Sequence, residues 1–161
     1  MIQAVDCFKK YGDPRGTQFQ PTWMTMYQVD PDIGALIPCL PHKIYLNKDL
    51  VTPLDNVLIE IYNQGLCPLI TEWGGAFNIR VVRGFEQKFN ELYGKGLIEA
   101  ADNLLSMHSW AIAWDWNMST NALGHLPTMD PRIVKILKDY GFDWGGDFTR
   151  KDGMHQQLQS L

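Results

Sequence analysis

The segment SMHSWAIAWDWN, residues 106–117, places a histidine and an aspartate seven residues apart among tryptophans and small apolar residues. The two side chains are either ordinary polar groups at the ends of a strand or two ligands of a metal site. A catalytic zinc ion usually has three protein ligands from histidine and carboxylate, with a fourth position open to water. The segment therefore suggests a metal site whose third ligand lies elsewhere in the chain.

The sequence DGMH near the C-terminus offers that third ligand. Asp152 precedes His155 by three residues, and Gly153 between them permits a tight turn that brings both side chains to one side. A carboxylate next to a metal ligand suits a general base that takes a proton from water. The spacing alone leaves the other interpretation open, in which these are hydrogen-bonded polar residues at strand ends.

Periodicity and turn signals predict the elements that would position these residues. Residues 110–117 alternate as a strand does, with Ala111, Ala113 and Asp115 on one face. Helices are predicted at residues 53–64, capped by Thr52, and at residues 131–140, capped by Asp130. Other strands are predicted at residues 43–47 and 67–73, within residues 74–82 after a turn at Gly74 and Gly75, and in the closing segments FDWGGDF and GMHQQLQSL.

Two regions differ from this pattern. Residues 1–50 are rich in proline and glycine turns and are expected to form an extended N-terminal arm. Residues 85–105 are expected to form two helical pieces broken by Gly94 and Gly96, as an insertion or a lid. Helices that interrupt a mostly antiparallel sheet give the α+β class, in a single domain spanning residues 1–161.

The composition excludes several classes of protein. With 45% hydrophobic and 20% charged residues, the chain is typical of a soluble globular protein, expected to be a monomer. The net charge of −4 argues against nucleic-acid binding. No apolar run approaches the roughly 20 residues that cross a bilayer, and the N-terminus does not resemble a signal peptide. Cys7, Cys39 and Cys67 form no C-x-x-C pair and are expected to be buried free thiols.

Three motifs, in order, resemble the M15 zinc peptidases, which include D-alanyl-D-alanine carboxypeptidases and L-alanyl-D-glutamate endopeptidases. SMHSWAIAWDWN resembles the family signature S-x-H-x-x-G-x-A-x-D. GFDWGGDF and DGMHQQL resemble W-G-G-D-[WF] and D-x-M-H-[FW]-x-L. GGAFNIRVVRG is similar to the family segment that carries an arginine, and YGDP resembles the opening of phage members. The resemblance spans nearly the whole chain and implies a Hedgehog/DD-peptidase-like fold with a central antiparallel sheet.

The resemblance also implies roles for individual residues. It implies three zinc ligands: His108, Asp115 and His155. Asp152 would be the general base. Arg80 matches the arginine that holds the substrate's carbonyl or carboxylate group. Its nearest rival is Arg83, because residues 85–105 separate Arg80 from the signature. Ser106 would line the substrate side, or else cap the start of a strand.

Several positions depart from the family pattern or have two interpretations. Ala111 replaces a glycine and is expected to narrow the cleft floor, and Gln156 replaces an aromatic residue and is expected to make one wall more polar. Asp147 either orders its turn or contacts a ligand histidine. Core packing is favoured over sugar stacking for four tryptophans: Trp110, Trp114, Trp116 and Trp144.

The expected function is zinc-dependent hydrolysis of the stem peptide of bacterial peptidoglycan. The favoured form is a phage endolysin that cleaves the L-alanyl-D-glutamate bond, made in the host cytoplasm and acting on the wall after release. A D-alanyl-D-alanine carboxypeptidase is the alternative within the class. A non-catalytic wall-binding or virion structural protein is the alternative outside it, and a Hedgehog-like signalling module is less favoured. A serine hydrolase using Ser106 and His108 is disfavoured, because their spacing creates no base-to-nucleophile hydrogen bond.

Overall fold

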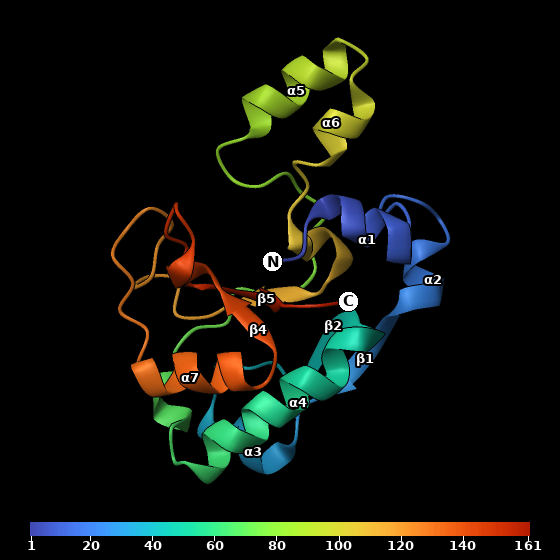
Figure 1. Ribbon diagram of the computed structural model, residues 1–161. Coiled ribbons are helices and arrows are strands. Elements are labelled where there is room, and N and C mark those ends of the chain that lie inside the picture. The colour runs from blue at the N-terminus through green and yellow to red at the C-terminus, as the bar shows by residue number, and fades with distance from the viewer.

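Two small antiparallel sheets, with helices around them, form the body of the protein in the computed structural model, which describes residues 1–161 (Figure 1). The first sheet pairs β1 (Met24–Gln28) with β2 (Lys43–Asn47). The second has the order β3-β5-β4, with bounds Ala113–Asp115, His155–Leu158 and Phe142–Trp144. The α+β class predicted from the sequence is confirmed.

The helices are distributed along the whole chain. The α-helices are α1 (Ala4–Tyr11), α2 (Phe19–Trp23), α3 (Pro31–Leu36), α4 (Lys48–Asn63), α5 (Glu86–Gly94), α6 (Ile98–Asp102) and α7 (Pro131–Asp139). Three short 3-10 turns complete the set: η1 (Cys67–Leu69), η2 (Met107–Trp110) and η3 (Gly145–Asp147). No helix is both long enough and apolar enough to span a lipid bilayer.

One continuous core extends through the body and includes the buried faces of α4 and α7, which pack together in the lower half of Figure 1. Both helices bury one apolar face, as the 3.6-residue period of their leucine, isoleucine and valine residues requires. Trp110, Trp114 and Trp116 are fully buried in this core. The core-packing interpretation of these three tryptophans is therefore confirmed, and none of them has a surface on which a sugar could stack.

The prediction of an extended arm over residues 1–50 was wrong. This region contains α1, α2, α3 and the β1–β2 pair, and only the strand predicted at residues 43–47 is confirmed. The sequence VDPDIG looked like a turn, but Asp30 caps α3, its carboxylate accepting hydrogen bonds from the backbone of Asp32 and Ile33. An aspartate followed by proline starts a helix as well as a turn, so local composition did not separate the two.

The start of α4 also differs from its prediction. The helix begins at Lys48 with Asn47 as its cap, whose side chain accepts from the Asp49 backbone, and Pro53 lies inside it rather than at its first turn. The cap is fully buried and also donates to the Trp110 carbonyl. The contact of Asn47 with Trp110 thus places the start of α4 before Pro53, although local propensity would place this proline in the first turn. By contrast, α7 starts at Pro131 behind the Asp130 cap, as predicted.

Three predicted strands are shorter or absent. Residues 67–73 form a 3-10 turn and a single bridge from Trp73 to Trp116, and residues 74–82 form only one bridge, from Val81 to Leu105. Of residues 110–117 only β3 is a strand, because Trp110 is the last residue of η2 and Ala111 adopts a left-handed conformation with φ of 54°. Both faces of this segment are buried, so apolar alternation overstated the length of the strand.

The two helical pieces predicted over residues 85–105 are confirmed as α5 and α6, a hairpin that projects from the body (Figure 1). Its two ends return to neighbouring positions. The Val82 N–H donates to the Leu104 carbonyl at 2.8 Å, and the Val81–Leu105 bridge lies beside this bond. The hairpin therefore enters and leaves the body at one place.

Gln156 faces the core and not the site, contrary to its expected place in one wall. It is adjacent to His155 on β5, so the alternation of a strand turns its side chain to the opposite face. It is fully buried, it lies opposite Trp114 in the sheet, and neither amide atom has a hydrogen-bond partner. An unpartnered buried amide lowers stability.

We expect Gln156→Met, which keeps the length of the side chain, to raise the free energy of unfolding by about 1–3 kcal/mol, because it removes two unpartnered polar atoms. Urea titration followed by circular dichroism measures this change. Gln159→Met is the matched control on an exposed position and should change stability by less than about 0.5 kcal/mol. A loss of stability in Gln156→Met would show that the buried amide is hydrogen-bonded through water.

Candidate metal centre

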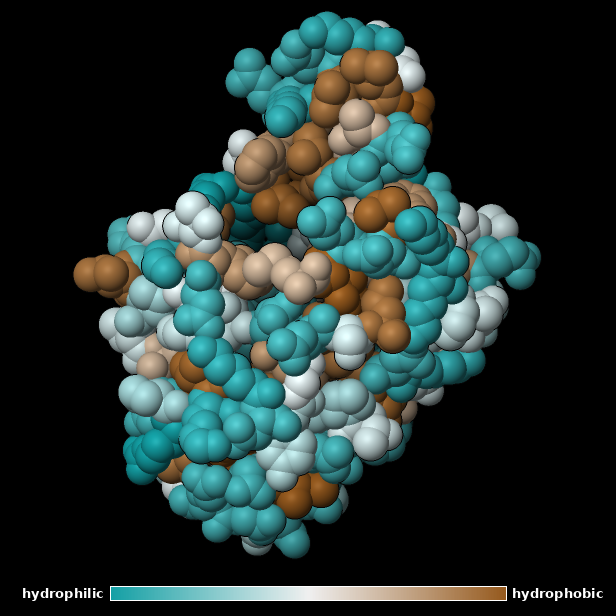
Figure 2. Space-filling model, viewed as in Figure 1, coloured by the Kyte–Doolittle hydropathy of each residue, from teal (hydrophilic) through white to brown (hydrophobic).

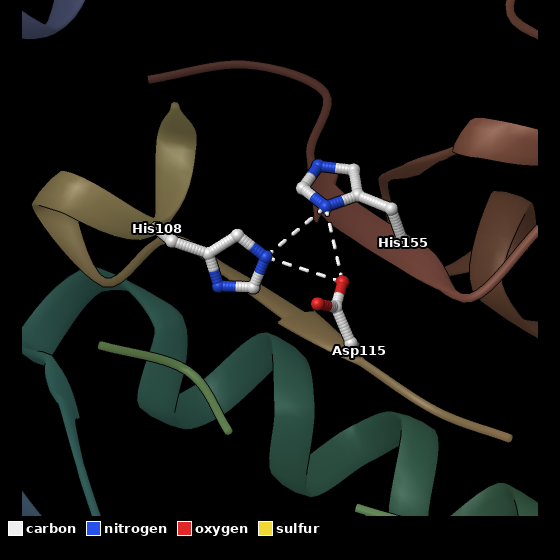
Figure 3. A group of neighbouring side chains, drawn as sticks. All are labelled: His108, Asp115 and His155. Atoms are coloured by element: carbon white, nitrogen blue, oxygen red, sulfur yellow. Dashed lines mark hydrogen bonds and ion pairs between the residues drawn. The ribbon is translucent and has the colours of Figure 1, made fainter. Parts of the chain in front are cut away.

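Three side chains from separate segments converge on one point (Figure 3). His108 Nε2 lies 3.2 Å from Asp115 Oδ1 and 3.2 Å from His155 Nδ1, and His155 Nδ1 lies 3.3 Å from Asp115 Oδ1. All three residues are buried. The structure thus brings together the three side chains that the sequence predicted as ligands.

The backbone explains how they meet. Asp115 and His155 are direct partners in the β3–β5 ladder, so their side chains leave the sheet on the same face. His108 comes from η2, where its backbone N–H donates to Ser106 Oγ. Ala111 then ends η2 in a left-handed conformation, which turns the chain into β3. This left-handed conformation accounts for the glycine that the family signature has at this position. The methyl group of Ala111 is fully buried rather than in the cleft floor.

Each histidine has a second partner that accepts a hydrogen bond. His108 Nδ1 lies 3.2 Å from the Ala76 carbonyl, and His155 Nε2 lies 3.0 Å from Gln157 Oε1. Because both partners are oxygen acceptors, they hold a proton on those ring nitrogens. The other nitrogens, His108 Nε2 and His155 Nδ1, then direct lone pairs at one another and at Asp115, which suits metal ligation.

The charges of the group also suit a cation. Burial by itself raises the pKa of the Asp115 carboxyl, but the two histidines that contact it outweigh burial and bring its pKa well below the ordinary value. Burial lowers the pKa of His108, against the opposing effect of Asp115. A carboxylate anion beside a neutral imidazole is the protonation state in which both groups bind a metal.

The spacing fits zinc. Ligand atoms at the usual zinc distance of about 2.0–2.1 Å from a tetrahedral ion are about 3.3 Å from one another. The three observed separations, 3.2, 3.2 and 3.3 Å, match that value. Two imidazoles and one carboxylate also form the type of ligand set that leaves a fourth position for water.

Asp152 lies at the edge of this group, in a cavity of about 420 Å³ that His155, Arg80 and Gln157 also line. Its Oδ1 atom is buried without a hydrogen-bond partner, and burial raises the pKa of the carboxyl. Its backbone is held by Gly145, whose carbonyl accepts from the Asp152 N–H at 2.9 Å. A Cβ atom on Gly145 would lie 2.2 Å from the Asp152 carbonyl, which explains the need for this glycine of the WGGD motif.

Arg80 and Arg83 both border the group. Each lines the 420 Å³ cavity and a second cavity of about 40 Å³ beside His108 and Asp115. Neither guanidinium lies within ion-pair distance of a carboxylate of the chain. Burial and the nearby Arg83 lower the pKa of Arg80.

The hairpin does not displace Arg80 from the signature segment. The Arg80 carbonyl accepts hydrogen bonds from the Ser106 N–H at 2.9 Å and from Ser109 Oγ at 3.1 Å, and the Arg80 N–H donates to Ser109 Oγ. The ends of the hairpin come together next to these bonds, so its length does not change the distance from Arg80 to Ser106. Figure 2 shows a hollow beneath the hairpin where apolar and strongly hydrophilic residues meet.

The structure also places the other residues that the sequence analysis singled out. Ser106 lines the 420 Å³ cavity, and its hydroxyl caps the start of η2 rather than the start of a strand, while its expected place on the substrate side stays a prediction. Asp147 is exposed and pairs with Lys138 at 2.7 Å, and it contacts no ligand histidine. Cys7, Cys39 and Cys67 are free thiols, although Cys39 is only partly buried. Trp144 donates to the Gly153 carbonyl within the turn that joins Asp152 to His155.

Two supporting groups were missed in the sequence. Gln157 follows His155 by two residues, and the period of a strand places both on one face, so this contact was predictable. The Ala76 carbonyl was not, because any residue type carries that group and only the course of the loop brings it to His108. Gly74 permits this course, since a Cβ atom there would lie 2.8 Å from Cβ of Asp115.

We expect His155→Ala and Asp115→Asn to abolish stoichiometric zinc binding, because each removes one of only three ligands. Metal analysis after dialysis against trace zinc, together with the shift in melting temperature on adding zinc, measures this. His42→Ala and His125→Ala are controls on exposed histidines and should bind one zinc ion per chain like the unaltered protein. Zinc binding retained in both ligand variants would place the metal elsewhere.

Comparison with known proteins identifies the region that carries the site. Residues 99–158 match the family model Peptidase_M15_4, described as D-alanyl-D-alanine carboxypeptidase. A search of curated proteins and a search of solved structures found no match. The matched region contains Ser106, Asp152 and the three converging side chains, while Arg80 and most of the α5–α6 hairpin precede it. Residues 99–158 of the chain are therefore similar to the M15 peptidase family, which agrees with the resemblance of the sequence motifs.

Proposed function

We propose that the protein is a zinc-dependent peptidase that cleaves the stem peptide of bacterial peptidoglycan, on the Hedgehog/DD-peptidase-like fold expected for its family. The observation that carries the proposal is the convergence of three acceptor atoms within 3.3 Å of one another, beside a cavity lined by an unpartnered carboxylate. The match to the M15 family supports it independently. The metal would be held by His108, Asp115 and His155.

Each residue of the group has a distinct task in this proposal. A zinc ion held there would supply Lewis acidity, which polarises a peptide carbonyl and makes water a better nucleophile near neutral pH. Asp152 takes the proton from the attacking water and later delivers it to the leaving amine. Its raised pKa suits both steps, because a base with a pKa closer to the working pH also releases its proton more readily.

Arg80 is the proposed donor to the substrate's carbonyl or carboxylate oxygen. It is partly buried and anchored by Ser109 on both its backbone N–H and its carbonyl, whereas Arg83 is exposed at the rim of the same cavity. A fixed donor stabilises developing negative charge better than a mobile one, because it requires no reorganisation during the reaction. Ser106 would line the substrate side of the cavity.

The favoured scissile bond is L-alanyl-D-glutamate, and the favoured biological role is that of a phage endolysin. The YGDP opening, which resembles phage members of the family, supports this choice. An endolysin would be made in the host cytoplasm and reach peptidoglycan after release. The description of the matching family favours the alternative, a D-alanyl-D-alanine carboxypeptidase.

We expect Asp152→Ala to bind zinc and fold normally but to hydrolyse purified peptidoglycan about 10²–10⁴-fold more slowly, since it removes the proton acceptor. Turbidity loss of wall preparations and metal analysis of the same samples measure the two properties. Asp147→Ala is the matched control, an exposed aspartate of the neighbouring turn, and should keep full activity. Equal activity in Asp152→Ala would refute its assignment as the base. No hydrolysis of any wall type by the unaltered, zinc-loaded protein would favour a wall-binding protein instead.

Arg80→Ala should lower kcat/KM by about 10²–10³-fold, as expected for loss of a fixed donor to developing charge. Arg83→Ala, at the exposed rim, should have a much smaller effect. Steady-state kinetics on a defined muropeptide compare the two variants. The reverse order of effects would assign the role to Arg83.

The bond itself is identified by mass spectrometry of muropeptides after digestion. Cleavage at L-alanyl-D-glutamate separates the stem peptide from the sugar-linked alanine, whereas a carboxypeptidase releases only the terminal D-alanine. Release of D-alanine from a pentapeptide stem, with the rest intact, would establish the alternative.

A further inference from the structure

Gln157 is a buried glutamine whose only side-chain hydrogen bond is to His155. Its Oε1 atom lies 3.0 Å from His155 Nε2, while its Nε2 atom is buried and has no partner. Both residues lie on β5, two positions apart and thus on the same face of the sheet. A buried amide with one unpartnered atom lowers the free energy of unfolding. Gln157 is therefore not explained by a contribution to stability.

The hydrogen bond determines which nitrogen of His155 is free. His155 directs Nδ1 at Asp115 Oδ1 and His108 Nε2, and that atom can bind a cation only while the ring proton is on Nε2. Gln157 Oε1 is an acceptor and cannot donate, so it holds the proton on Nε2. The Ala76 carbonyl does the same for Nδ1 of His108.

The two histidines thus use opposite ring nitrogens toward the metal, and each depends on its own acceptor. For His108 the acceptor is a backbone carbonyl, which no substitution of the side chain removes. For His155 it is a side chain on a central strand, held in place because β5 pairs with β3 on one side and β4 on the other. Gln157 is therefore the one partner of the histidines whose effect a substitution can measure.

We propose that Gln157 is a positioning residue of the metal centre, which fixes the ring orientation and proton of His155 so that Nδ1 is presented to zinc. The inference rests on the proposed function, since it assumes that the group binds zinc. Gln157 is then a fourth side chain of the metal centre, which contacts a ligand and not the metal. Loss of such a partner typically lowers metal affinity about 10–100-fold.

The test compares Gln157→Met, which keeps the length but loses the acceptor, with Gln157→Glu, which keeps an acceptor oxygen. Zinc affinity is measured by competition with a chromogenic chelator. We expect Gln157→Met to bind zinc about 10–100-fold more weakly and Gln157→Glu to bind at least as tightly as the unaltered protein. Gln156→Met is the control on the opposite face of β5 and should leave zinc affinity unchanged.

A second readout follows the proton itself. In the zinc-loaded, nitrogen-15-labelled protein, the Nε2 proton of His155 should give a protected downfield resonance that exchanges much faster with water in Gln157→Met. A purely structural role would lower the melting temperature of this variant without changing zinc affinity or that resonance. If Gln157→Met does not fold, Gln157→Asn, whose shorter side chain withdraws the carbonyl, replaces it with the same expected result.

The outcomes separate the two proposals. Equal zinc affinity and an unchanged His155 proton in the folded variants would overturn the role of Gln157 while leaving the metal centre intact. If the unaltered protein binds no zinc, the proposed function itself fails, and the role of Gln157 falls with it.

Discussion

The arrangement depends on three electron-pair acceptors that lie within 3.3 Å of one another in a buried setting. Such atoms repel each other unless protons or a cation lie between them. The acceptors outside the triangle hold the histidine protons away from its centre, so they increase the need for a cation at that point. A site of this kind is held together most strongly when it is loaded, which couples metal binding to stability.

The rest of the fold is organised around this point. The β3–β5 ladder sets Asp115 beside His155, and the left-handed turn at Ala111 carries the chain from His108 into β3. The WGGD turn holds the backbone of Asp152 through Gly145. Short strands suffice here because their task is to fix the register of two side chains, while α4, α7 and the buried tryptophans supply the apolar burial.

The sequence predicted the site better than the elements that carry it. The group of His108, Asp115 and His155 was predicted from the resemblance of the motifs to the M15 family, since residue chemistry alone left an alternative open, and Asp130 with Pro131 correctly marked the start of α7. The extended arm over residues 1–50 was wrong, because turn-forming residues there also begin short helices. Gln156 was predicted to line the site because the two faces of its strand were not distinguished. Side chains alternate along a strand, so Gln156 faces away from His155 and into the core. Contacts made by backbone groups, such as the Ala76 carbonyl, cannot be predicted from residue types, because every residue carries these groups.

The α5–α6 hairpin leaves and rejoins the body at adjacent residues, and this has an evolutionary consequence. Closing a loop costs entropy that rises only slowly with its length, so segments of very different size can be grafted between the same two anchor points. The three converging side chains lie on the body side of that junction, and Phe85 and Asn103, at the ends of the hairpin helices, contribute to the wall of the 420 Å³ cavity. A hairpin of another length or composition could therefore be joined at the same two points and change the cavity wall, while the three converging side chains keep their arrangement.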